Sequence, residues 1–152
     1  MRFYTHIAFS VLIYLIITKT GSFAMASPYW FLAVMLLFTA LPDIDTIDSK
    51  ISREIKILSR VITFLTKHRG MMHSLFPPFI LFFVINTFSA EFAFAAAIGY
   101  LSHLAADMLT KQGIMFLYPF SKARIHWFIR TGGLVEKVFF IAVLCGITWL
   151  LF

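Results

Sequence analysis

The chain has 152 residues, of which 61% are hydrophobic and 13% are charged, and its 13 Lys and Arg outnumber its 7 Asp and Glu. An average globular domain is roughly 45–50% apolar and about 25% charged, so this composition excludes an ordinary soluble domain and a disordered chain. The single cysteine excludes a disulfide scaffold. We therefore expect an all-α integral membrane protein that forms one domain over residues 1–152.

Apolar stretches predict about five membrane-spanning helices, because about 20 mostly apolar residues cross the roughly 30 Å hydrocarbon core. They cover residues 3–18, 29–41, 71–90, 92–109 and 134–152. Pro77 and Pro78 are expected to kink the third helix, since neither has a backbone N–H. Ala24-Met25-Ala26 has the outline of a signal-peptide cleavage site. A secretory segment has no need of His6, however, so we expect the first helix to be retained.

Residues 46–67, between the second and third stretches, are predicted to form an amphipathic helix in the membrane interface. Its isoleucines and leucines recur at intervals of three and four residues and share one face, while its Lys and Arg fall elsewhere. The alternative is that this helix packs on the protein and does not touch lipid.

The basic residues predict the orientation of the chain. Arg2 and the loops after the second and fourth stretches hold almost all of the loop Lys and Arg, whereas the alternate connections hold only Lys19. By the positive-inside rule the N-terminus is cytoplasmic and the C-terminus external. The positive charge is expected to attract anionic lipid headgroups, and no nucleic-acid partner is expected.

Ionisable side chains recur at the cytoplasmic ends of the predicted spans. They are His6, Asp43, Asp45, His68, His73, His103, Asp107 and Glu136. Because such groups are costly within a bilayer, they are candidates for function. Simpler roles remain open: a membrane histidine often joins two helices by a hydrogen bond, a carboxylate at a helix end is usually solvated, and Glu136 could pair with Lys137 or Arg130.

These residue types predict a divalent-metal site, because imidazole and carboxylate ligands suit zinc, manganese or iron. His103 and Asp107 are one helical turn apart, so both can reach one ion. Asp43 and Asp45 cannot share a helical face, but Pro42 favours a turn on which both can point inward. The set exceeds one tetrahedral site, which predicts two or three ions, an arrangement used in phosphoryl displacement.

Four segments resemble the membrane-bound metal-dependent hydrolase family, also called the LexA-binding, inner-membrane-associated hydrolases. They are His6, Leu41-Pro42-Asp43-Ile44-Asp45, His68-Arg69-Gly70-Met71-Met72-His73-Ser74 and Gly99-Tyr100-Leu101-Ser102-His103-Leu104-Ala105-Ala106-Asp107. The resemblance implies a prokaryotic inner-membrane protein with a metal site. A more remote similarity, to zinc-dependent phospholipase C and P1-type nucleases, implies that His103 and Asp107 match the His-xxx-Asp ligand pair of those enzymes. The same similarity implies five further metal ligands, which are His6, Asp43, His68, His73 and Glu136.

The function expected from these features is hydrolysis of a phosphoester, with zinc as the metal, at the cytoplasmic leaflet. The substrate would be a membrane lipid, either a phospholipid or a polyprenyl phosphate. Asp45 is the predicted general base, and Arg69 and Arg124 are predicted to hold the phosphate. The alternatives are a divalent-metal transporter, which needs ligands near the middle of the bilayer, and a non-catalytic scaffold that binds a regulator. Only the family name supports the regulator.

Overall fold

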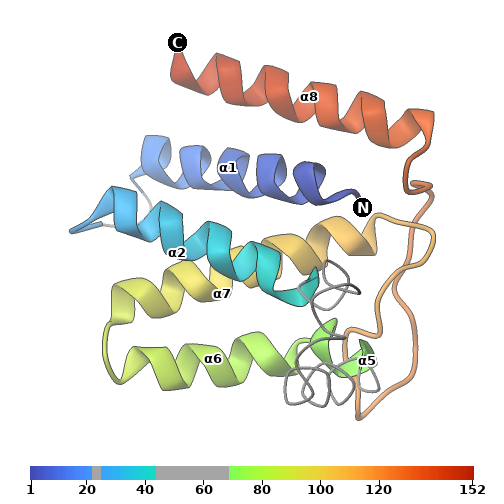
Figure 1. The fold of residues 1–152 in the computed structure, drawn as a ribbon, viewed down its shortest axis with the longest axis horizontal. Helices are drawn as coiled ribbons and strands as arrows, with labels where there is room; N and C mark the ends of the chain where they lie inside the picture. Colours follow the sequence, from blue (N-terminus) through green and yellow to red (C-terminus); the bar gives the residue numbers. More distant parts are fainter. Residues whose placement is uncertain (22–24, 44–68) are drawn as a thin grey trace, which may run out of the picture.

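The computed structural model describes residues 1–21, 25–43 and 69–152, and it shows helices lying side by side (Figure 1). These elements are α1 (Phe3–Thr20), α2 (Pro28–Ala40), the 3-10 turn η1 (Leu41–Asp43), α5 (Arg69–Met72), α6 (Phe76–Asn86), α7 (Ala90–Met108) and α8 (Leu134–Leu151). Extended pairing in these ranges is limited to isolated bridges between Thr110 and Ile129 and between Ile114 and Ile125. The predicted all-α class is therefore confirmed for the described residues.

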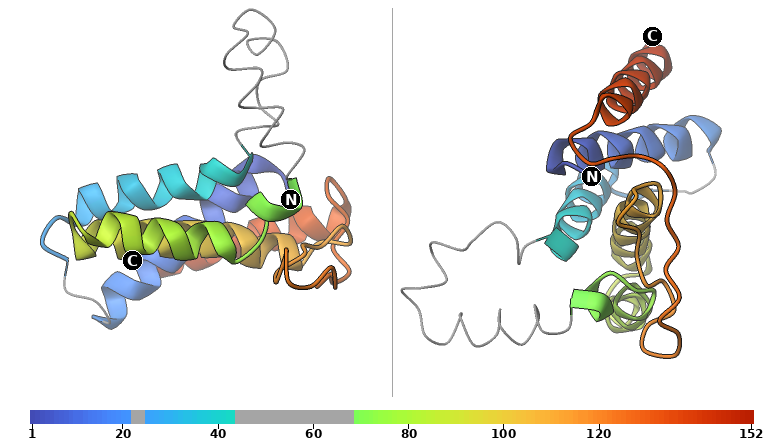
Figure 2. Two further views of the ribbon diagram at one scale, coloured as in Figure 1. Left: turned by 90° about the horizontal axis from the view of Figure 1, so that it is seen from below. Right: turned by 90° about the vertical axis from the view of Figure 1, so that its right-hand side faces the viewer.

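Helix α7 lies in the middle of the bundle, where it packs against α2 on one side and α6 on the other. Helix α1 contacts α2 and α7, and α8 packs on the outer side of α1. Successive helices run in opposite directions. The starts of α1, α6 and α8 and the ends of α2 and α7 therefore lie at one end of the bundle, which the right-hand view of Figure 2 faces. We call this end the polar end, because the predicted ligands gather there.

The helices support fewer membrane spans than the sequence predicts. By length and composition, α1 and α8 could each cross a membrane among the described residues. The apolar segments Pro28–Asp43 and Phe76–Asn86 are shorter, and α7, which carries Glu91, His103 and Asp107, does not reach the same apolarity. The prediction of about five spans therefore goes beyond what these helices support.

The third predicted helix, over residues 71–90, is interrupted near its start. Helix α5 ends at Met72, and α6 begins at Phe76 with Pro77 and Pro78 in its first turn. Proline is favoured there, because the first amides of a helix have no carbonyl partner within it. The predicted kink is therefore wrong, since the two prolines start a helix instead of bending one.

Helices α2 and α7 approach each other most closely at Gly99. A Cβ atom at this position would overlap the carbonyl oxygen of Met35, which is backbone and cannot turn away. We expect Gly99→Ala to separate α2 from α7 and to lower the free energy of unfolding by about 1–3 kcal/mol, as in other overpacked cores. The loss of helical circular dichroism on titration with sodium dodecyl sulfate measures this change.

Gly146→Ala in α8 is the matched control. A Cβ there would lie 3.1 Å from Cδ1 of Leu12, the mobile end of a side chain that can shift. The midpoint of unfolding should therefore fall much less in this variant. Equal midpoints for the two variants would contradict the close contact between α2 and α7.

Candidate metal centre

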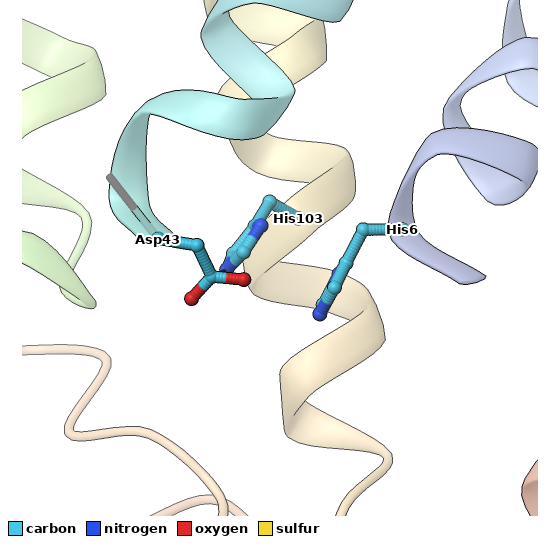
Figure 3. A group of neighbouring side chains, drawn as sticks. All are labelled: His6, Asp43 and His103. Carbon is cyan, nitrogen blue, oxygen red and sulfur yellow. Dashed lines mark ion pairs between the residues drawn. The ribbon is translucent and has the colours of Figure 1, made fainter. Parts of the chain in front are cut away.

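Five predicted ligands come together at the polar end, each from a different position in the fold. His6 lies in the first turns of α1, Asp43 ends η1, His73 follows α5, and His103 and Asp107 occupy the last turns of α7. Figure 3 shows three of them, with the Asp43 carboxylate and the His6 ring on either side of the His103 ring. Two overlapping groups have ligand atoms within 4.8 Å of one another: His6, Asp43 and His103, and His73, His103 and Asp107.

Four donor atoms have the spacing of ligands around one small ion. His103 Nε2 lies 3.5 Å from Asp107 Oδ2 and 3.8 Å from Asp43 Oδ1. His73 Nε2 lies 3.8 Å from each of the same two oxygens. Ligands that bind zinc tetrahedrally at about 2.0–2.1 Å are about 3.4 Å from one another. These four distances are up to a few tenths of an ångström longer than that value.

The second oxygen of Asp107 faces a different set of groups. Its Oδ1 atom lies 2.7 Å from the amino group of Met1 and 3.3 Å from His6 Nε2. The two oxygens of this carboxylate therefore contact separate groups, His73 and His103 through Oδ2, and His6 and the Met1 ammonium through Oδ1.

The orientation of His103 places one ring nitrogen, Nε2, inside the cluster without a hydrogen bond in the described residues. Its Nδ1 atom lies 2.9 Å from the carbonyl oxygen of Thr39. Because a carbonyl oxygen can only accept, Nδ1 donates in this contact, and Nε2 faces Asp43 and Asp107. The Nε2 atom is buried and has no hydrogen-bond partner among the described residues. Histidines that ligate metals are commonly fixed in this way through their other nitrogen.

His6 also has ring nitrogens without a hydrogen bond in the part of the chain that the structure describes. The residue is only 1% exposed, and its ring stacks on that of His103 with centroids 4.0 Å apart and planes inclined by 11°. Buried polar atoms of this kind are costly and rare in proteins. A bound cation would satisfy His6 Nε2 and His103 Nε2 together, so the donor set fits a metal.

The carboxylate of Asp43 faces two imidazole rings. Its Oδ1 atom lies 3.8 Å from His73 Nε2 and 3.8 Å from His103 Nε2. Asp43 therefore places a carboxylate, which binds cations in its ionised form, beside both rings.

A layer of hydroxyl groups supports His103 from the interior. Thr39 Oγ1 lies 2.8 Å from Ser10 Oγ. It donates to the carbonyl oxygen of Met35 in α2 or to that of Gly99 in α7. Ser102 Oγ also donates to the Gly99 carbonyl oxygen, at 2.7 Å. These contacts connect α1, α2 and α7 behind the cluster. Thr39 is not among the residues predicted from the sequence. The sequence does hold a signal for it, because Pro42 has no N–H and so cannot donate a hydrogen bond to the Thr39 carbonyl oxygen three residues earlier.

Glu136 lies outside both groups of candidate ligands. It is 2% exposed, and its Oε1 accepts hydrogen bonds from the amide of Arg2 at 2.6 Å and from Thr5 Oγ1 at 3.1 Å. Its Oε2 accepts from the amide of Gly132. The structure therefore uses this carboxylate to join the start of α8 to the start of α1, and pairs it with amides and a hydroxyl instead of Lys137 or Arg130.

We expect Glu136→Gln to lower stability without changing metal content. The substituted amide would turn an N–H₂ group toward buried donors, which costs about 1–3 kcal/mol. Unfolding in detergent and elemental analysis of the same sample measure the two effects. Lys137→Gln, an exposed neighbour, should change neither. A loss of bound metal from Glu136→Gln with unchanged stability would instead make Glu136 a ligand.

The remaining predicted site residues are not placed at the cluster. Asp45 and His68, like the predicted interfacial helix at 46–67, lie outside the described residues. Arg69 is the first residue of α5, and its side chain is not described. Arg124 is exposed in the connection between α7 and α8, where its Nη1 donates to the Gln112 carbonyl oxygen at 3.4 Å.

The apolar helices and the cluster of His and Asp side chains together define a helical membrane-associated protein with a candidate metal centre. Residues 1–151 match the YdjM inner membrane protein family, and the chain belongs to that family. It is therefore a protein of the cytoplasmic membrane.

Two curated relatives illustrate the range of the family. The chain is 36% identical over 111 residues to YvsG of Bacillus subtilis (strain 168), a match that covers 71% of this chain and 67% of that protein. It is 34% identical over 117 residues to the inner membrane protein YdjM of Escherichia coli (strain K12), covering 72% of this chain and 57% of that protein. The chain thus spans little more than half of the Escherichia coli relative. No solved structure matches the chain.

Proposed function

We propose that this protein is a membrane-embedded, metal-dependent hydrolase that cleaves a phosphoester of a lipid or polyprenyl phosphate at the cytoplasmic leaflet. The observation that carries the proposal is the cluster of two buried residues, His6 and His103, with the half-buried Asp43, His73 and Asp107, in which several donor atoms lie near ligand spacing. The family resemblance to membrane-bound metal-dependent hydrolases supports the same activity.

The proposed cofactor is a pair of zinc ions, or three, with manganese or iron as alternatives. Two positions are favoured by the two faces of Asp107, one toward His73 and His103 and the other toward His6. Ions bound there would activate water and neutralise charge on a phosphoryl group. Asp43 and Asp107 supply negative charge to hold them.

The residues of the chain would divide the remaining work. The Thr39 carbonyl oxygen fixes the tautomer of His103 and so keeps Nε2 available. Asp45 is the proposed base that accepts a proton from water, and Arg69 and Arg124 are the proposed phosphate clamps. For Arg124 this requires the exposed connection between α7 and α8 to swing its guanidinium away from Gln112.

The proposed topology has five membrane-crossing segments, α1, α2 with η1, α6, α7 and α8, with the polar end at the cytoplasmic face. The alternating direction of these helices supports it, because the helix ends that carry or adjoin predicted ligands then lie at one depth. A reporter fused after Phe152 should be external, and a cytoplasmic reporter signal would contradict the orientation.

A divalent-metal transporter is the main alternative, and the interior of the bundle disfavours it. Beyond the Ser10–Thr39 hydroxyl contact, the space between α2 and α7 is filled by Phe31, Met35 and Ala95, each 0% exposed. In this described part of the interior, apolar side chains replace the ion ligands that a route across the membrane needs.

The activity can be tested with purified protein in lipid vesicles that contain phosphatidic acid, phosphatidylglycerol or a polyprenyl diphosphate. Release of phosphate or of a phosphorylated headgroup distinguishes phosphatase from phospholipase C-type cleavage. We expect cleavage of at least one lipid, its loss on treatment with a chelator, and its return on addition of zinc.

Two results would reject the hydrolase proposal. Metal-loaded protein that leaves the whole lipid panel intact would favour a scaffold that binds a regulator. Zinc flux into vesicles without lipid cleavage would favour a transporter. Inclusion of a fluorescent zinc indicator inside the same vesicles separates these two outcomes.

A further inference from the structure

An apolar cavity of about 260 Å³ opens beside the candidate metal centre. One wall is formed at the start of α6 and the other by the connection that follows α7. The residues that line these walls are Leu75, Phe76 and Phe79 on the first and Phe116, Leu117, Tyr118 and Phe120 on the second. The surface that these residues present to the cavity is apolar.

The cavity begins close to a candidate ligand. Leu75 follows His73 by two residues, so their Cα atoms are at most about 7.6 Å apart. The amide of Leu75 donates to the Phe116 carbonyl oxygen at 2.9 Å, which ties the two walls together. Tyr100, on α7, donates from its hydroxyl to the Met72 carbonyl oxygen at 2.6 Å. The cavity and the His73 turn are therefore both held against the helix that carries His103 and Asp107.

The mouth of the cavity faces the surroundings of the protein. Phe79 is 61% exposed and Phe120 is 88% exposed. For a protein of the cytoplasmic membrane, the medium that meets such aromatic side chains is lipid. Lys122 and Arg124 lie two and four residues after Phe120 and are exposed. Cationic side chains near the membrane surface attract the phosphates of lipid headgroups.

We propose that this cavity binds one hydrocarbon chain of a phosphate-bearing lipid whose headgroup lies at the candidate metal centre. The inference rests on the proposed function, because it takes the cluster as the place where the phosphate binds. The volume lies below the roughly 300–1,000 Å³ that hold a drug-sized ligand, so the cavity accommodates part of a single chain.

The chemistry of the lining selects this occupant over a peptide. A peptide segment would bury backbone N–H and C=O groups, and an apolar lining leaves them without partners at considerable cost. A hydrocarbon chain has no such groups and gains the full benefit of leaving water or headgroups. A charged phosphate attached to it would be excluded from the cavity and directed toward His73.

Photo-crosslinking tests this assignment without requiring turnover. The full chain is reconstituted in vesicles of a phosphate-free glycolipid that contain phosphatidic acid with a diazirine on one acyl chain. We expect adducts to concentrate in the peptides that contain residues 75–79 and 116–120. Excess unlabelled phosphatidic acid should remove them, and excess diacylglycerol, which has the chains but no phosphate, should not.

Phe79→Ala and Phe83→Ala form a matched pair of variants on α6. Both side chains are exposed, at 61% and 56%, and their rings touch with centroids 4.8 Å apart, but only Phe79 lines the cavity. We expect Phe79→Ala to reduce labelling of the two peptides about tenfold, as loss of one phenylalanine contact implies, and Phe83→Ala to leave it unchanged. Leu75→Trp, which fills the cavity from the other wall, should also prevent labelling.

The outcomes separate this inference from the proposed function. Adducts spread evenly over the exposed faces of α6 and α8, or equal labelling of both phenylalanine variants, would overturn the cavity assignment even if lipid phosphate is cleaved. Adducts at the two peptides, with the whole lipid panel left uncleaved by the metal-loaded protein, would retain the cavity as a lipid site and reject the hydrolase. Labelling that diacylglycerol competes away would show a chain-binding surface unrelated to phosphate and would also overturn the proposal.

Discussion

Replacing His103 with alanine is expected to reduce the affinity for zinc by more than about 100-fold, since loss of a group that only orients a metal ligand already costs about 10–100-fold. His103 belongs to both groups of candidate ligands, and its Nε2 is the buried nitrogen that lies nearest to Asp107 Oδ2. Elemental analysis after dialysis against a competing chelator of known affinity measures the change.

His126→Ala is the control for this experiment, because His126 is an exposed histidine in the connection between α7 and α8. It should retain the metal content of the unaltered protein. His103→Gln, which preserves much of the volume of the side chain, covers the case in which alanine disrupts the bundle. A folded His103→Gln variant with unchanged zinc affinity would show that the cluster does not depend on this residue.

The substitution Asp107→Asn is expected to have the largest effect on activity. It keeps the size of the side chain but removes the negative charge that faces His73 and His103 through Oδ2 and His6 and Met1 through Oδ1. Because one bound metal contributes several kcal/mol to phosphoryl transfer, we expect lipid phosphate cleavage to fall at least about 1,000-fold.

Glu91→Gln provides a matched carboxylate-to-amide change on the same helix. Glu91 lies in the first turn of α7, at the opposite end from Asp107, where its Oε1 accepts a hydrogen bond from the amide of Ser27 at 2.9 Å. A glutamine retains an acceptor oxygen, so activity should stay within a few-fold of the original. Similar losses from both substitutions would mean that the change acts through stability and not through the cluster.

The depth of a side chain along its helix could be read from the sequence, whereas its direction around the helix depended on packing. His103 and Asp107 illustrate the first case, because a spacing of four residues places them on one face whatever the helix packs against. Glu136 illustrates the second. It lies at the same end of the bundle, but the free amide of Arg2 and the hydroxyl of Thr5 draw its carboxylate toward the start of α1.

Helix boundaries followed the local chemistry of the chain more closely than its hydropathy. The first and last predicted stretches, 3–18 and 134–152, correspond to α1 and α8 within two residues at each end. The predicted stretch at 71–90 does not, since Ser74 Oγ donates to the Met71 carbonyl oxygen and closes a turn before α6. Hydropathy averages over such a turn, so it could not indicate that His73 lies on an irregular segment beside Asp43.

X-ray absorption at the zinc edge of the purified protein tests the central claim most directly. The cluster predicts bound zinc with nitrogen and oxygen neighbours at about 2.0–2.1 Å and no sulfur at about 2.3 Å, since the ligands are imidazoles and carboxylates. Two ions bridged by Asp107 would add a metal neighbour at about 3.5–4 Å. Protein that retains no transition metal, or zinc bound through sulfur, would contradict the assignment of His6, Asp43, His73, His103 and Asp107 as a metal centre.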